Sequence, residues 1–396
     1  MSCLLGHSHP EVVEVIKEYA DKLIHISSRM VSPPTINLAK RLTSLLPPGL
    51  DRVLFLSTGS ESNEAAIKLA KMYTGKFEIV GLAQSWHGMS GAAQGAQYQG
   101  GRRGQGPSVP GQFMLPQPNS YRSIFRHKDG SYDWKTELDY GWSLIDQASN
   151  GSIAACLVEC IQGDGGIHVL PPGYLAALKR HCEQRRALLI VDEAQTGLGR
   201  TGKLFGIDHE DIVPDILTLS KPLGNGLPVS AVITSQEIDR VANERGFLFF
   251  TTHANDPLVT AVGGKVLEIV TRKGTLEAVT ARSQQLLAGL RHLQERYGCI
   301  GDVRGRGLMA GIEIVSDRDG KEPAVELAGE LSRNMVKRGL WSQLQDGKVF
   351  RIGPPINSTD EEIQFGLKIL EDVFRHTANT HALTNGEQSN GISSVS

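Results

Sequence analysis

Six short runs of apolar residues alternate with helical patterns along the first two thirds of the chain. They are VLFLS from Val53, FEIVGL from Phe77, AACLVE from Ala154, ALLIV from Ala187, ILTLS from Ile216 and VSAVITS from Val229. Runs of this kind lack a polar face, so we expect strands of a mainly parallel sheet that helices cover on both sides. The alternation predicts the α/β class with a doubly wound sheet.

Helical periodicity continues beyond this region. It covers Thr275–Tyr297, Val325–Arg338 and Asp360–Arg375, with the apolar run GDVRGRGLMAGIEIV between the first two. These segments predict a smaller α+β domain over residues 276–376, after a large domain over residues 31–275. Residues 1–30 are expected to be an apparently truncated N-terminal arm that packs on the smaller domain. The polar residues 377–396 are expected to be a disordered tail.

Composition excludes several classes of partner. The 41 lysines and arginines nearly balance the 43 aspartates and glutamates, so no basic field for nucleic acid or an anionic membrane is present. No stretch approaches the roughly 18 consecutive apolar residues that span a bilayer. The five cysteines are odd in number and scattered along the chain, which favours reduced thiols and a cytoplasmic location over a disulfide framework.

The first apolar run leads into LSTGSESNEAAIKLAK, a glycine turn followed by a helical pattern. Thr58, Gly59 and Ser60 would direct hydroxyl and backbone N–H groups toward an anion at the positive end of the helix dipole. An ordinary helix N-cap explains the same pattern, because serine and threonine are common at that position. The stretch therefore indicates either a phosphate site or a capped helix.

Two further polar residues follow apolar runs. Asp192 ends ALLIVD and Lys221 follows ILTLS, so both are expected at the carboxyl edge of the sheet, where ligands of open α/β sheets bind. A carboxylate there can pair with a protonated pyridine nitrogen, and a partly desolvated lysine can form a Schiff base. Taken singly, Lys221 is more simply a structural residue at a strand end, and for Asp192 an aspartate that caps a turn is an equal alternative. Together with the anion cradle they favour one site.

Trp86 and Arg351 also stand out. Trp86, in AQSWHGMSGAA, follows a predicted strand and could stack on a flat cofactor ring, although a core tryptophan is an equal alternative. Arg351, in FRIGPPINST, offers a guanidinium suited to bidentate binding of a carboxylate, and a structural ion pair is its alternative.

The combined motifs resemble the class III, fold-type I pyridoxal-phosphate aminotransferases, and within them most closely the 2,2-dialkylglycine decarboxylases. The motifs that carry the resemblance are GHSHPE, LSTGSESNEAAIKLAK, QSWHGM, DEAQTGLGRTG, PDILTLSK, TTHANDPL, IGDVRGRGL and FRIGPP. The resemblance extends from Leu5 to about Arg375. It implies a fold-type I transferase and a homodimer, or a dimer of dimers, with active sites at the subunit interface.

The resemblance also implies residue roles. Lys221 would hold pyridoxal phosphate as a Schiff base, Asp192 would pair with its ring nitrogen, and Gln195 would hydrogen-bond near its phenolic oxygen. The phosphate would be bound by Thr58, Gly59 and Ser60, together with Thr252 from the neighbouring subunit. Trp86 would flank the cofactor and the substrate, and the substrate would also contact Met89, Asp164 and Arg351.

A potassium ion is a further implication of the resemblance. The positions that match its ligands are Ser28, Thr252 and Asp256, with the backbone of Ile26 and Ala254. Oxygen ligands of this kind suit a hard cation.

The expected reaction is decarboxylation-coupled transamination. A small 2,2-dialkylglycine such as 2-aminoisobutyrate would lose carbon dioxide, and a 2-oxo acid such as pyruvate would accept the amino group. Asp164, in ECIQGDGG, replaces a serine of the decarboxylases and favours an alternative, an ordinary class III aminotransferase without decarboxylation. A non-catalytic protein that binds pyridoxal phosphate is the third possibility.

Overall fold

A computed structural model describes residues 2–99, 104, 106–210 and 212–381. The chain forms two compact units. The larger comprises the residues up to Thr280 together with Pro354–Asn357, and the smaller comprises Ala281–Gly353 and the residues from Ser358. The division falls inside helix α9 (Thr275–Arg296), a few residues after the boundary that the sequence pattern suggests.

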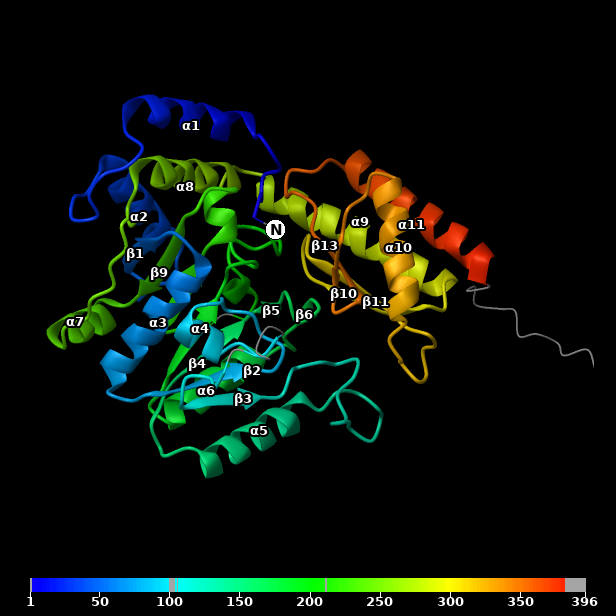
Figure 1. The fold of residues 1–396 in the computed structure, drawn as a ribbon, viewed down its shortest axis with the longest axis horizontal. Helices are drawn as coiled ribbons and strands as arrows, with labels where there is room; N and C mark the ends of the chain where they lie inside the picture. The colour runs from blue at the N-terminus through cyan, green and yellow to red at the C-terminus, as the bar shows by residue number, and fades with distance from the viewer. Residues whose placement is uncertain (1, 100–103, 105, 211, 382–396) are drawn as a thin grey trace, which may run out of the picture. The chain divides into compact units, whose positions relative to one another are not determined.

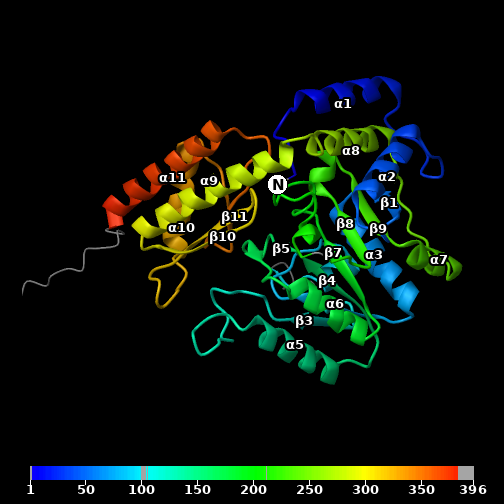
Figure 2. The same cartoon turned by 180° about the vertical axis from the view of Figure 1, so that it is seen from behind.

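A seven-stranded sheet forms the centre of the larger unit, in the order β1-β9-β8-β7-β4-β2-β3 (Figures 1 and 2). Its strands are β1 (Arg52–Leu56), β2 (Glu78–Leu82), β3 (Gln112–Leu115), β4 (Ile153–Glu159), β7 (Leu188–Asp192), β8 (Ile216–Leu219) and β9 (Ser230–Thr234). Every residue of the central strands β4 and β7 is buried, which explains their apolar runs. All neighbouring pairs are parallel except those that β9 makes with β8 and β1. The mainly parallel α/β fold is confirmed.

Helices pack on this sheet and its edges. Those of the larger unit are α1 (Pro10–Lys22), α2 (Pro33–Leu45), α3 (Gly59–Thr74), α4 (Gly91–Gly95), α5 (Trp134–Ala148), α6 (Tyr174–Gln184), α7 (Gln236–Glu244) and α8 (Pro257–Val270), with the 3-10 turns η1 (Gly206–His209) and η2 (Lys221–Gly224). A two-stranded ribbon joins β5 (Ile161–Gln162) to β6 (His168–Val169). The alanine-rich face of α3 packs into a core with residues of β1, β4 and β8. This packing fixes the start of α3 at the carboxyl edge of the sheet.

The N-terminal segment belongs to the larger unit. Helix α1 lies along α8 in Figures 1 and 2, and Arg272, which follows α8, donates two hydrogen bonds of 2.6 and 2.7 Å to the Glu11 carboxylate. Residues 1–30 therefore contact the larger unit, in place of the smaller domain on which the sequence pattern puts them. The contact is long-range in sequence, since α1 carries the acidic partner of a basic residue beyond α8.

The smaller unit contains a four-stranded antiparallel sheet in the order β10-β11-β13-β12. Its elements are β10 (Ile300–Gly305), β11 (Ala310–Ile314), α10 (Val325–Lys337), β12 (Gln343–Gln345), β13 (Val349–Ile352) and α11 (Asp360–His381). Helix α11 extends through the first five residues of the tail that was expected to be disordered, and residues 382–396 lie outside the described part of the chain. In the part that the structure describes, no helix has the length and apolar character needed to cross a membrane.

Candidate active site

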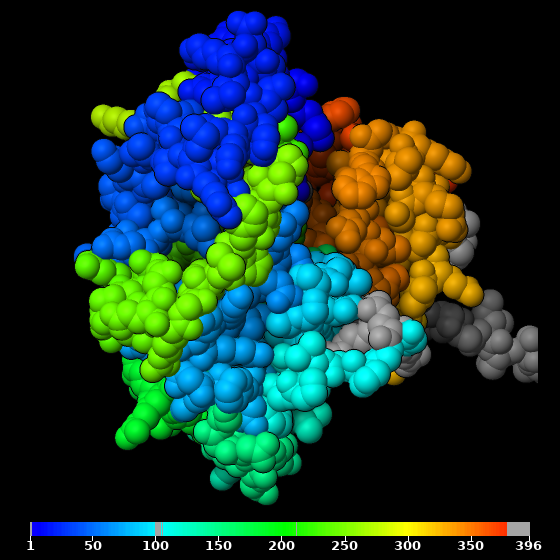
Figure 3. All heavy atoms as spheres, turned by 60° about the vertical axis from the view of Figure 1, so that its left-hand side comes forward, coloured from blue at the N-terminus to red at the C-terminus, as the bar shows by residue number. Residues whose placement is uncertain are grey.

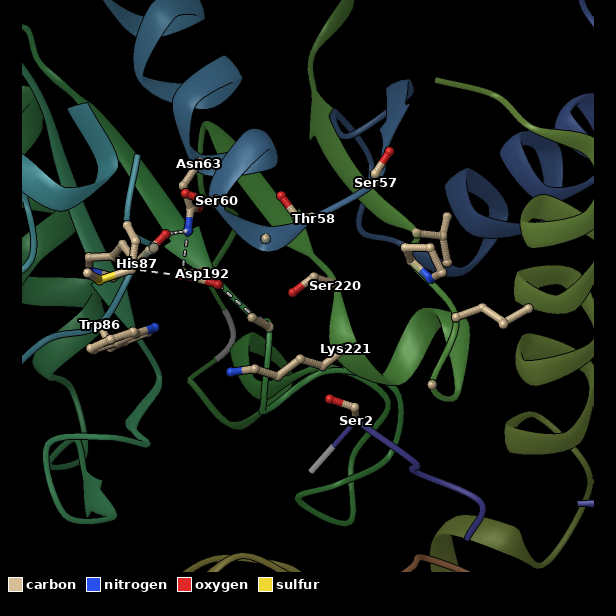
Figure 4. A pocket seen from close by; sticks show the side chains of 18 residues that line it. Ser2, Ser57, Thr58, Ser60, Asn63, Trp86, His87, Asp192, Ser220 and Lys221 are labelled. Atoms are coloured by element: carbon tan, nitrogen blue, oxygen red, sulfur yellow. Dashed lines mark hydrogen bonds and ion pairs between the residues drawn. The ribbon is translucent and has the colours of Figure 1, made fainter. Parts of the chain in front are cut away.

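A cavity of about 530 Å³ opens at the carboxyl edge of the large sheet (Figure 4). Residues that follow β1, β2, β7 and β8 line it, as expected for a ligand site in an open α/β sheet. The structure brings together seven of the residues singled out in the sequence: Thr58, Gly59, Ser60, Trp86, Met89, Asp192 and Lys221. These residues are spread over more than 160 positions of the chain, so the sheet topology alone assembles them.

The turn before α3 is both a helix cap and a wall of the cavity. Thr58 Oγ1 accepts a hydrogen bond of 3.2 Å from the Glu61 backbone, and the Glu61 carboxylate accepts one of 3.1 Å from the Thr58 backbone. This reciprocal capping box satisfies two amides of the helix end. Gly59 and Ser60 lie between the capped residues and line the cavity at the positive end of the helix. The N-cap and anion-site interpretations of this stretch therefore describe compatible features.

Asp192 is a buried, ionised carboxylate. Its Oδ2 atom accepts hydrogen bonds of 2.8 Å from Asn63 Nδ2 and 2.9 Å from His87 Nδ1, and its Oδ1 atom accepts one from the Ala194 backbone. Burial raises the pKa of the Asp192 carboxyl, but these hydrogen bonds and the charge of His87 oppose burial and bring the pKa below its usual range. The cavity thus has a fixed negative charge at one end.

Asn63 and His87 are functional residues that the sequence did not single out. Both side chains are buried, and they hold the Asp192 carboxylate from α3 and from the loop after β2 (Figure 4). Asn63 also accepts a hydrogen bond from Thr218 on β8. The sequence could have indicated His87, because it directly follows Trp86 after a predicted strand.

Lys221 is the first residue of η2, directly after β8. Figure 4 shows its side chain extending into the cavity, toward the side where Trp86 and Asp192 lie. Its backbone φ angle is +20°, which is unusual for a residue with a side chain. Strained backbone of this kind is concentrated at functional sites, since the surrounding fold must hold it in place.

A buried glutamate positions Trp86. The Glu159 carboxylate, at the end of β4, accepts hydrogen bonds of 3.1 Å from the Trp86 backbone and 2.9 Å from the Gly163 backbone. Burial raises the pKa of Glu159 to about 7. This group therefore links the loop of Trp86 to the loop after β4 through a proton-sensitive contact.

Glu159 should make stability pH-dependent. Because its pKa is raised, the folded chain keeps a proton that the unfolded chain loses above its ordinary pKa, so stability falls as the pH rises toward about 7. The shift corresponds to at most about 3 kcal/mol. In Glu159→Gln this titration is absent, and we expect its melting temperature to change less between pH 5 and 8 than that of the wild type. Glu244→Gln, on the surface of α7, is the control, and equal pH slopes in all three proteins would contradict the assignment.

Gln195 and Asp164 form a pair beside the cavity. Gln195 Nε2 lies 3.2 Å from Asp164 Oδ2, and Gln195 comes directly after the cavity-lining residue Ala194. Neither is among the described residues that line the cavity. The structure therefore connects Asp164 to the segment that carries Asp192.

The fold and this site match known aminotransferases. Residues 1–374 match the family described as "Aminotransferase class-III". The chain is 47% identical to an uncharacterized aminotransferase of Schizosaccharomyces pombe, over 96% of this chain and 85% of that protein. It is 34% identical to an acetylornithine aminotransferase of Caldanaerobacter subterraneus, over 93% and 87% of the two chains. The chain belongs to the class III aminotransferases. A crystal structure of an (S)-enantioselective omega-transaminase from Thermomicrobium roseum superposes with a TM-score of 0.87 at 31% identity, covering 94% of this chain and 86% of the other.

Class III aminotransferases are enzymes that use pyridoxal phosphate, and the cavity fits that cofactor. An ionised carboxylate can pair with the protonated ring nitrogen, a lysine amine can bond to the aldehyde, and a helix N-terminus can receive the phosphate. Gly88 supports the fit. A Cβ atom there would lie 2.3 Å from Ser60 Oγ, in addition to requiring a φ angle of +128°. Glycine thus leaves room for the Ser60 hydroxyl, which also accepts a hydrogen bond of 3.2 Å from the Ser90 backbone.

Arg351 and Thr252 are not among the described residues that line the cavity. Arg351 is a buried residue of β13 in the smaller unit, and its Nη1 atom donates a hydrogen bond of 3.1 Å to Gln343 Oε1. Thr252 is exposed in the segment before α8. The substrate-binding role of Arg351 and the phosphate-binding role of Thr252 in a neighbouring subunit stay predictions.

The carboxylate of Asp256, one of the predicted potassium ligands, has two imidazole neighbours. Asp256 Oδ1 lies 2.6 Å from His25 Nδ1, and Asp256 Oδ2 lies 2.8 Å from His253 Nδ1. Ile26 and Ser28 are half-buried in the loop after His25, and Ala254 is buried. A hard cation prefers oxygen ligands, so the two imidazoles are poor partners for it.

Proposed function

We propose that this class III aminotransferase transfers the amino group of a small amino compound to a 2-oxo acid, with loss of a substrate proton and no loss of carbon dioxide. The observation that carries the proposal is the Asp164 carboxylate beside Gln195. A carboxylate beside the cavity attracts a donor that carries an amine, and an acidic residue at this position resembles the ordinary class III aminotransferases more than the decarboxylases. The names of the acetylornithine aminotransferase and the omega-transaminase among its relatives support the same reaction class.

The residues of the cavity would have separate roles in this reaction. When bound, pyridoxal phosphate accepts the electron pair of the bond that breaks next to the substrate nitrogen. The Asp192 carboxylate keeps a proton on the ring nitrogen through its charge. Lys221 Nζ would take the proton from the substrate carbon and deliver it to the other carbon that is bonded to the substrate nitrogen. Trp86 bounds the cavity and limits which substituents fit beside the ring.

Decarboxylation-coupled transamination is the second candidate. Trp86 and Met89 come from the QSWHGM motif that resembles the 2,2-dialkylglycine decarboxylases, and both line the cavity. In that reaction a dialkylglycine would lose carbon dioxide, and Arg351 would bind the carboxylate of the 2-oxo acid.

A substrate comparison separates the two reactions. The holoenzyme is incubated with pyruvate and either 2-aminoisobutyrate or a set of amino donors that carry a hydrogen next to the amine, and both alanine and carbon dioxide are measured. We expect alanine from the second set and no carbon dioxide from 2-aminoisobutyrate. Stoichiometric carbon dioxide and alanine from 2-aminoisobutyrate would instead establish the decarboxylase.

Asp164→Ser tests the observation itself. Without the carboxylate, kcat/KM for donors that carry a second amine should fall relative to kcat/KM for alanine. The ratio of the two values is measured. Asp146→Ser, at an exposed position on α5, is the matched control. An unchanged ratio in Asp164→Ser would remove the support that Asp164 gives to plain transamination.

The proposal includes a homodimer in the cytoplasm. Thr252 is exposed in the single chain, in keeping with a role in a neighbouring subunit. The structure describes all five cysteines and shows no disulfide among them, which supports a reducing compartment.

A further inference from the structure

Three side chains that can bind a metal lie together outside the cavity. His25 lies in the loop between α1 and α2, while His253 and Asp256 lie in the segment that leads into α8. Figure 3 shows this yellow-green segment on the surface beside the blue N-terminal residues. The cluster therefore joins two parts of the larger unit that are more than 220 positions apart in the chain.

The geometry is close to that of a metal site. One ring nitrogen of His25, one of His253 and a carboxylate oxygen of Asp256 all lie within 4.8 Å of one another. The shortest separations, 2.6 and 2.8 Å, are from each imidazole to the carboxylate. Tetrahedral zinc, with bonds of about 2.0–2.2 Å, places its ligand atoms about 3.3 Å apart. Lengthening these two separations by about 0.5–0.7 Å would bring them to the spacing of zinc ligands.

Burial divides the cluster into a fixed and an adjustable part. The Asp256 side chain is 10% exposed, whereas those of His25 and His253 are 45% and 67% exposed. Asp256 occupies the N-cap position of α8, where its side chain makes no capping hydrogen bond, so its carboxylate is available to a ligand. The two rings border solvent and can adjust by rotation. The rings meet edge to face, with centroids 5.2 Å apart, and both direct Nδ1 toward the carboxylate.

We propose that His25, His253 and Asp256 bind a divalent transition-metal ion of the zinc type. Each imidazole would present the Nδ1 lone pair to the ion and carry its proton on Nε2, and Asp256 would supply one oxygen. Water would complete the coordination, since both rings border solvent. Two nitrogen ligands and one carboxylate select an ion of intermediate softness over potassium.

Metal binding would fasten the segment before α8 to the loop after α1. The ion would bind the folded chain and not the unfolded one, so it should raise the melting temperature by mass action. None of the three residues lines the cofactor cavity of the same chain.

A zinc titration tests the site directly. Tag-free holoenzyme, freed of unbound pyridoxal phosphate and treated with a chelator, is titrated with Zn²⁺ by calorimetry, and bound metal is counted by elemental analysis after dialysis. We expect one ion per chain and a higher melting temperature in its presence. An excess of K⁺ should not displace the ion. Displacement by K⁺, or a titration without saturation, would overturn the proposal.

Single substitutions identify the ligands. His25→Ala and His253→Ala should each weaken Zn²⁺ binding by more than about 100-fold, since even residues that only support a ligand contribute about 10–100-fold. His292→Ala, an exposed histidine of the smaller unit, is the matched control and should bind zinc as the wild type does. The visible spectrum of bound Co²⁺ should change in the first two variants only.

Folding is checked separately from binding. Both rings are largely exposed, so the variants should keep the cofactor absorbance and the metal-free melting temperature of the wild type. If either alanine variant fails this check, His25→Gln or His253→Gln replaces it. Zinc affinity that is unchanged in folded variants of both histidines would assign the binding to other surface groups and refute the site.

Discussion

Lys221→Ala should reduce transamination by at least about 10⁴-fold, the upper part of the range for loss of a positioned acid–base group. Lys221 has two roles in the proposed reaction, the covalent bond to the cofactor and the proton transfer, and no water molecule could replace both. The variant should still bind pyridoxal phosphate, because Asp192 and the N-terminus of α3 do not depend on the lysine.

Two measurements check this result. Absorbance should show cofactor bound without the protonated Schiff base, and a borohydride treatment that fixes the cofactor to the wild type should leave the variant unlabelled. Lys273→Ala, at an exposed position after α8, should behave as the wild type in both. Substantial turnover in Lys221→Ala, or cofactor fixed to the variant chain by borohydride, would show that another amine holds the cofactor.

The strands of the large sheet were predictable because burial on both faces leaves a continuous apolar run. The antiparallel direction of β9 could not be predicted from its composition. It follows from its connection, since the ten residues between Leu219 and Ser230 contain only a 3-10 turn and are too short for a parallel crossover. Strand β3 escaped prediction because its four residues form an edge strand with a mixed pattern.

The cavity was predictable to the extent that strand ends determine it. Thr58 and Lys221 follow strands and Asp192 ends one, and the carboxyl ends of parallel strands lie at the same edge of the sheet. The groups that orient these residues could not be found in this way. Asn63 lies one turn inside α3, and only its packing against β8 turns the amide toward Asp192.

The placement of residues 1–30 depended on a long-range contact. The helical pattern of α1 was predicted, but a local pattern does not show which domain the helix covers. The pairing of Glu11 with Arg272 connects residues more than 250 positions apart, and no signal in either segment indicates it.

The second large effect is expected from Asp192→Asn, which should reduce turnover by about 10²–10³-fold, as does loss of one preorganised electrostatic group in other enzymes. The amide is nearly isosteric with the carboxylate but carries no charge, so the ring nitrogen would lose the group that keeps it protonated. Cofactor binding should persist, since Lys221 and the phosphate cradle remain. The readouts are kcat with a saturating donor and the pH dependence of the cofactor spectrum.

A second carboxylate separates this effect from a general loss of structure. Asp215 precedes β8 at the opposite edge of the sheet, where it accepts hydrogen bonds of 2.6 Å from Lys179 and 2.7 Å from the Leu189 backbone. Asp215→Asn should lower the melting temperature without changing the cofactor spectrum, because it touches neither the cavity nor its lining. Asp192→Asn should instead change the cofactor spectrum and lower kcat. If both variants lost activity only in proportion to lost folded protein, Asp192 would be a structural residue, and the negative charge at the end of the cavity would have no part in the reaction.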